Sequence, residues 1–149
     1  MDLLFQEAGK MDFTSCRKNK LIKEIKIDHN LVSALIQSSA KKLKSQDMLK
    51  LSDDTASSKI TLIYDSVREL LEALAVSNGY KIYNHECYTS FLKEILKESN
   101  LGQNFDNFRK IRNDINYYGK LVSMEESEFI INQMKEFLKT LKLKFFSAK

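Results

Sequence analysis

The residues best suited to chemistry lie together in one stretch, from Phe108 to Gly119. On a helical wheel of about 100° per residue, the apolar side chains of this stretch fall on one side. The polar side chains fall on the other side, and four of them recur with the i, i+3, i+4, i+7 spacing: Arg109, Arg112, Asn113 and Asn116. The stretch therefore predicts a helix whose polar patch borders a buried stripe.

This patch combines two guanidinium groups, two carboxamides and the phenol of Tyr117. A guanidinium group can hold a phosphate through two parallel hydrogen bonds, and amides or hydroxyls can contact ribose and base edges. Aromatic rings such as that of Tyr118 can stack on bases, and Lys120 adds a cation beside them. The residue types are compatible with RNA or nucleotide binding. Taken alone, however, such residues are more often part of a solvated helix face, and Arg112 could pair with a buried carboxylate.

Other kinds of site are poorly supported. The sequence has no phosphate-binding glycine loop, dinucleotide fingerprint, HExxH or GxSxG motif. Cys16 and Cys87 are its only cysteines and lie 71 positions apart, which fits neither a disulfide framework nor a zinc site. We expect Cys87 to be a small core residue rather than a nucleophile paired with His85, because i and i+2 face different sides of a helix. Two histidines are too few for a metal cluster, so we expect no metal and no cofactor.

The sequence shows neither a membrane-spanning segment nor a signal peptide. No apolar run approaches the roughly 18 residues of a membrane span, and the start is acidic with too short an apolar stretch for a signal peptide. We therefore expect a cytoplasmic protein with no membrane partner. Residues 1–27 are predicted to form an N-terminal basic arm. Met11 is a second possible start, so residues 1–10 are either an extension or a remnant of cloning.

Helical patterns dominate the rest of the chain. Proline is absent, and proline costs about 3 kcal/mol inside a helix. Apolar periodicity predicts five helices, with Asp28 capping the first and a capping box at Ser123–Glu126 beginning the last. The first of these helices covers residues 28–49, and the second runs from the loop at 52–55 to residues 77–79. The other three cover residues 86–99, 105–118 and 123–145. Three glycines, at 79, 102 and 119, are expected at helix ends. Residues 28–149 should thus form an all-α, up-and-down antiparallel bundle of about five helices, with no convincing strand.

The polar helix also resembles the signature helix of HEPN domains (higher eukaryote and prokaryote nucleotide-binding), especially small stand-alone prokaryotic members. The matching residues read Arg109-x-x-Arg112-Asn113-Asp114-Ile115-Asn116-Tyr117-Tyr118-Gly119. Residues 63–75, the following 79–81 and 84–86, and the Met11–Cys16 start are similar to other parts of that family. The resemblance implies an all-α homodimer with a cleft lined by both signature helices. In active members an Arg and a His separated by four to six intervening residues cleave RNA without metal, and many members are toxins neutralised by a nucleotidyltransferase.

Carried over residue by residue, Arg112 matches the motif arginine and Asn113 the polar residue after it, while Tyr117 or Tyr118 replaces the histidine. Tyrosine, with a pKa near 10, is a poor proton shuttle at neutral pH. The candidate catalytic residues are Arg112, Asn113 and Tyr117. The candidate nucleic-acid contacts are Arg109, Arg112, Asn116, Tyr118 and Lys120.

Three interpretations remain open from the sequence. The leading one is an HEPN-like RNA- or nucleotide-binding domain, the partner of a nucleotidyltransferase in a toxin–antitoxin-type pair. The alternatives are an active metal-independent ribonuclease toxin, in which His85 could substitute if its turn folds over the cleft, and a non-catalytic helical adaptor. In each case we expect a homodimer that pairs two copies of the 105–118 helix, with Phe105, Tyr117 and Tyr118 supplying contacts.

Overall fold

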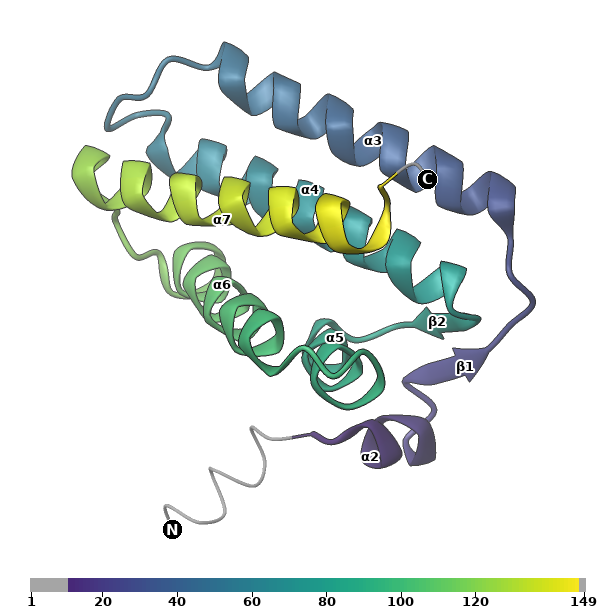
Figure 1. Ribbon diagram of the computed structural model, residues 1–149. Helices are drawn as coiled ribbons and strands as arrows, with labels where there is room; N and C mark the ends of the chain where they lie inside the picture. The colour runs from purple at the N-terminus through teal and green to yellow at the C-terminus, as the bar shows by residue number, and fades with distance from the viewer. Residues whose placement is uncertain (1–10, 148–149) are drawn as a thin grey trace, which may run out of the picture.

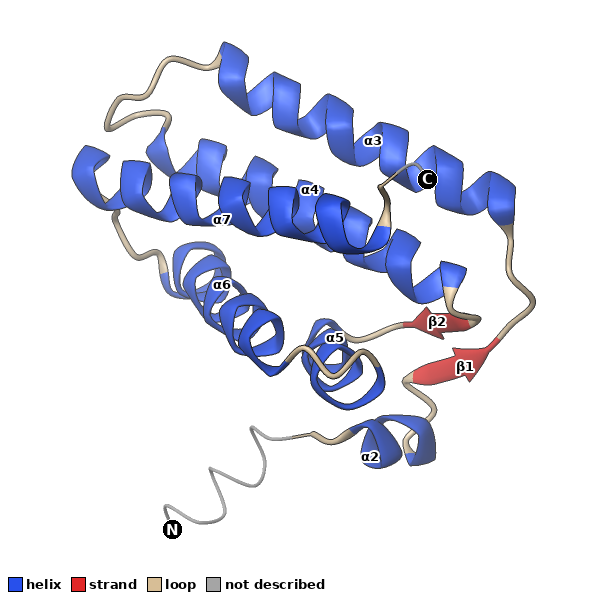
Figure 2. Ribbon diagram, viewed as in Figure 1, coloured by secondary structure: helices blue, strands red, loops and turns tan. Residues whose placement is uncertain are grey.

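The computed structural model describes residues 11–147 and shows a bundle of helices with one small sheet (Figures 1 and 2). The elements in order are α2 (Phe13–Lys18), β1 (Ile22–Glu24), α3 (His29–Met48), α4 (Ala56–Ser77), β2 (Tyr80–Ile82), α5 (His85–Ser90), the π-helical turn η1 (Phe91–Ile95), α6 (Ser99–Tyr118) and α7 (Met124–Phe145). The predicted all-α class is therefore confirmed. The first ten residues, expected to be an extension, lie outside the described part.

Helix α4 forms the centre of the core. Most of its side chains are buried, and it packs against α3, α6, α7 and β2. Its contact with α3 is close, because Ser39 and Ser66 face each other and each hydroxyl donates to the other's backbone carbonyl at 2.7 Å. Figure 1 shows α3, α4 and α7 side by side, with α6 and α5 on the opposite side of α4 from α3. This arrangement presents α6 to α4, α5 and α7 together.

Several predicted helix boundaries are confirmed by their caps. The carboxylate of Asp28 accepts a hydrogen bond from the Leu31 amide at 3.0 Å, and the hydroxyl of Ser123 accepts one from the Glu126 amide at 3.2 Å. The second half of the expected capping box is replaced, because the Glu126 carboxylate bonds the Ser123 hydroxyl instead of its backbone amide. Gly119 ends α6 with a φ of +64°, in the left-handed region that favours glycine.

The prediction around Gly102 was wrong. The α-helix expected over residues 86–99 ends at Ser90 and is followed by the π-helical turn η1. Helix α6 begins at Ser99 rather than near residue 105. Gly102 therefore lies inside α6, and a Cβ atom there would come within 2.5 Å of Lys93 Cγ. This glycine permits a close approach between α6 and η1 instead of ending a helix.

The described part of the expected basic arm is folded onto the bundle. Phe13 and Cys16 are buried, and β1 pairs with β2 in antiparallel register, with Ile22 opposite Ile82. Cys16 and Cys87 form a disulfide between α2 and α5. The expectations of no convincing strand and of no disulfide framework are thus corrected, because the fold brings together residues that lie far apart in the sequence.

None of the helices in residues 11–147 combines the length and the apolar character needed to cross a membrane. Within the same residues, no three His, Cys, Asp or Glu side chains are grouped so that they could hold a metal ion.

Candidate functional site

Three buried side chains fix the orientation of α6. Phe105, Phe108 and Ile115 point into the core, where the Phe105 ring stacks on Tyr64 of α4 and the Phe108 ring packs edge-on against Phe137 of α7. With this stripe anchored, the side chains of Arg109 and Arg112 lie on the flank of α6 that faces α4 and α5. The helical wheel thus places the two arginines beside the core, as predicted.

Arg112 carries a charge that no described carboxylate neutralises. Its guanidinium carbon lies 5.6 Å from the ring centre of Tyr64 and 5.7 Å from that of Tyr117, within the range of cation–π attraction. One guanidinium nitrogen donates to the Tyr117 hydroxyl at 3.4 Å, whereas the buried Nε atom has no partner among the described residues. The alternative that Arg112 pairs with a buried carboxylate is therefore not what the structure shows.

Arg109 is held differently, although it is only one helical turn away. Its guanidinium group forms ion pairs with Asp106 at 2.9 Å and with Glu86 of α5 at 3.4 Å. Burial raises the pKa of Asp106, but hydrogen bonds from Arg109 and Lys110 outweigh this effect and lower it. Arg109 thus has its charge neutralised and is less suited to a phosphate than its position in the sequence predicted.

His85 joins the same flank from the start of α5. Asn84 caps this helix by accepting from the Glu86 amide at 2.8 Å, which sets the His85 Nδ1 atom 3.0 Å from the hydroxyl of the buried Tyr64. Burial, together with the positive charges of Arg68, Arg112 and Arg109, lowers the pKa of His85 to about 4. The imidazole is therefore neutral at neutral pH.

The proton arrangement of this pair follows from Tyr64. Burial raises the pKa of the Tyr64 hydroxyl above its usual value, so the phenol keeps its proton. That hydroxyl has no other acceptor among the described residues, so it donates to His85 Nδ1 and leaves the ring proton on Nε2. His85 can then donate a hydrogen bond to a ligand through Nε2.

We call Tyr64, His85, Arg112 and Tyr117 the Arg112 cluster. Tyr64 was missed by sequence analysis, and its only signal is a phenol within the aliphatic stripe of α4. The remaining predicted site residues are more scattered. Asn113 is half-buried on α6, while the others are exposed around the last turn of the helix and beyond it: Asn116, Tyr118 and Lys120.

No protein-family model, curated protein or solved structure matches this chain. The chemistry of the cluster therefore has to be judged from its own groups. It offers the guanidinium group of Arg112, a hydroxyl on Tyr117 and a ring N–H on His85, all of which can donate to an anion. The guanidinium group lies within cation–π range of the rings of Tyr64 and Tyr117, and the ring of Tyr117 is exposed enough to meet a base.

Proposed function

We propose that the Arg112 cluster binds a phosphate group of RNA or of a nucleotide, as an HEPN-like binding domain would. One observation carries this proposal: of the four arginines in the chain, Arg112 alone forms no ion pair with a described residue. Leaving a partly buried guanidinium group without a carboxylate costs stability, and an anionic ligand would offset that cost. The exposed ring of Tyr117 can stack on a neighbouring base.

Metal-independent RNA cleavage is a second candidate, and the place of His85 beside Arg112 favours it. A base at this position would have to accept a proton from the attacking 2′-hydroxyl. The proton on Nε2 and a pKa near 4 both work against that role. Binding is therefore the better-supported function, and cleavage requires the other tautomer of His85.

Binding can be measured by fluorescence anisotropy with a labelled single-stranded RNA at low salt, comparing the wild type with Arg112→Gln. We expect the variant to bind about 10–100-fold more weakly, because a hydrogen bond to a charged group contributes roughly 1.5–3 kcal/mol. Arg17→Gln is the matched control, since it removes one arginine charge from the exposed pair with Glu24 on the N-terminal part of the chain. Equal losses of RNA affinity in both variants would mean that overall charge alone determines binding, which would contradict the proposal.

The turn between α6 and α7 supports the proposal of a homodimer. Four large side chains are exposed there, namely Tyr117, Tyr118, Leu121 and Met124, and such a cluster favours contact with another protein surface. Phe105, expected at this interface, is fully buried and takes no part. Sedimentation of Leu121→Asp beside wild type tests the dimer, with a shift to monomer as the expected result.

The proposals of a nucleotidyltransferase partner and of a toxin–antitoxin-type role rest on the resemblance of α6 and α4 to HEPN domains. These two proposals imply a cytoplasmic location, where RNA and nucleotides occur. Co-expression with a nucleotidyltransferase encoded beside it, followed by co-purification, tests this partner directly. If each protein is recovered alone, the proposal of a nucleotidyltransferase partner is contradicted.

A further inference from the structure

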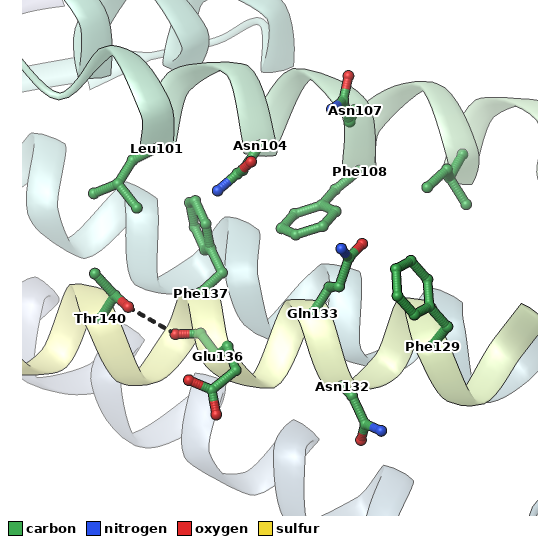
Figure 3. Close-up of a pocket in the computed structure, with 11 residues that line it drawn as sticks. Leu101, Asn104, Asn107, Phe108, Phe129, Asn132, Gln133, Glu136, Phe137 and Thr140 are labelled. Atoms are coloured by element: carbon green, nitrogen blue, oxygen red, sulfur yellow. Dashed lines mark hydrogen bonds between the residues drawn. The ribbon is translucent and has the colours of Figure 1, made fainter.

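A groove opens between α6 and α7, on a different flank of α6 from the Arg112 cluster. It has a volume of about 400 Å³, a size typical of ligand sites. Leu101, Phe108 and Phe137 form its buried floor. Figure 3 shows Asn104 from α6 and Gln133 from α7 projecting into the space between the two helices. The groove thus joins an apolar floor to carboxamides supplied by both walls.

The carboxamides favour a ligand that both donates and accepts hydrogen bonds. Asn104 and Gln133 form no side-chain hydrogen bond with any described residue, so both are available. A carboxamide offers two donors and an acceptor, which match the N–H and C=O groups of a peptide bond. In an extended chain these backbone groups are unpaired.

Other occupants fit the groove less well. Glu136 is the only charged side chain in the lining, so a phosphate backbone would meet a negative charge and no cation. A helix would also fit poorly, because its backbone groups are already paired and the two carboxamides would lose water without gaining partners. The charge of the groove matches a neutral or basic segment.

The length of the groove points in the same direction. Its α6 wall extends from Leu101 to Ile111, which at about 1.5 Å per residue is roughly 15 Å. Four to five residues of extended chain cover that length at about 3.3 Å each. A single flat ring would fill only part of it.

We propose that the α6–α7 groove binds an extended peptide segment of a partner protein. Apolar side chains at alternate positions of this segment contact Leu101, Phe108 and Phe137. Its backbone exchanges hydrogen bonds with Asn104 and Gln133, and a neutral or basic residue lies near Glu136. This proposal does not depend on the proposed function, because the groove and the Arg112 cluster share no residue.

The test uses the full chain and a phage-displayed library of random seven-residue peptides, since no partner sequence is known. Enriched peptides are synthesised and titrated by calorimetry. We expect them to alternate apolar residues and to lack acidic ones. The double variant Asn104→Leu/Gln133→Leu keeps side-chain size but removes the hydrogen-bonding groups, and it should weaken binding at least tenfold.

Three controls separate this result from others. Asn100→Leu replaces an exposed asparagine of α6 outside the groove and should bind as wild type does. Arg112→Gln should also bind peptides normally, which separates the groove from the proposed phosphate site. Glu136→Lys should weaken binding of basic peptides, and thermal melting should show that each variant folds.

The proposal is overturned if no peptide is enriched, or if enriched peptides bind the double variant as tightly as the wild type. It is also overturned if the enriched peptides are acidic and lose affinity in Arg112→Gln. In the last experiment, the protein is titrated with uncharged nucleosides. Binding of a nucleoside that the double variant abolishes, without peptide binding, would assign the groove to a base instead.

Discussion

The two flanks of α6 present different chemistry from the same helix. The flank toward α4 and α5 carries two arginines and meets Tyr64, His85 and Glu86. The flank toward α7 carries no cation in its groove and meets carboxamides, phenylalanines and the single carboxylate of Glu136. One amphipathic helix thus carries both the proposed phosphate site and, on its other flank, the proposed peptide groove.

The difference arises from what the neighbouring helices supply. The first turn of α5 brings Glu86 to Arg109 and His85 to Tyr64, yet no described carboxylate reaches Arg112. One arginine is therefore paired within the fold, and the next along the helix has no carboxylate partner among the described residues. Helix α7 supplies carboxamides and aromatic rings to the groove but no cation. The groove therefore has no positive potential that would attract phosphate.

The largest effect on the arginine flank should come from breaking the Cys16–Cys87 disulfide, which ties α5 to α2. A cross-link between residues 71 apart restricts the unfolded chain strongly, and such bonds typically contribute about 2–4 kcal/mol. Reduction should lower the free energy of unfolding by about that amount, as measured by urea denaturation with and without reductant. It should also weaken RNA binding more than peptide binding, because only the arginine flank contacts α5.

The control for this prediction is a Cys16→Ser/Cys87→Ser variant. Its unfolding midpoint should match that of the reduced wild type and should not respond to reductant. A wild type whose midpoint is also insensitive to reductant would mean that the disulfide contributes nothing to the stability of α5 and its surroundings.

The next largest effect concerns the pH dependence of stability. The pKa of His85 is lowered to about 4 in the folded protein, against about 6.5 for an unfolded histidine. Between these values the unfolded chain binds more protons, so stability is full above about pH 6.5 and is lost as the pH falls toward 4. Since the ring is partly exposed, we expect a loss of about 1–2 kcal/mol rather than the full shift.

Replacing the histidine should remove this slope. In His85→Gln, the free energy of unfolding should change little between pH 7 and 4.5, whereas the exposed His29→Gln should retain the wild-type slope. The pKa values of Asp12, Asp47 and Asp106 are lowered, so these carboxyl groups titrate below this window. Parallel slopes in the wild type and His85→Gln would show that the arginine flank does not hold this histidine neutral.

Local signals predicted much of the fold. The apolar periodicity of α4 and α7 located both helices, and Asp28 and Gly119 marked ends that the structure confirms. These features depend on side chains within one or two turns, where the sequence alone contains the needed information. The same limit explains the error at Gly102, because its role depends on Lys93 in another element.

The candidate site was only half predictable for the same reason. The patch on α6 follows from spacing, so Arg112 and Tyr117 could be named in advance. The contact with Tyr64 and the place of His85 depend on how α4 and α5 pack on α6, and no spacing within one helix encodes that. The ion pair between Arg109 and Glu86 is also long-range, which is why the two arginines looked equivalent in the sequence.

The smallest expected effect comes from making Arg109 more like Arg112. Glu86→Gln removes one of the two carboxylates that neutralise Arg109 and leaves its pair with Asp106. The added positive potential beside the Arg112 cluster should raise RNA affinity about twofold at low salt, since a unit charge acting through water contributes well under about 1 kcal/mol. The gain should vanish at high salt, where such interactions are screened. Glu128→Gln raises the net charge equally from an exposed position on α7, so an equal gain there would show that RNA responds to total charge and does not distinguish the two flanks.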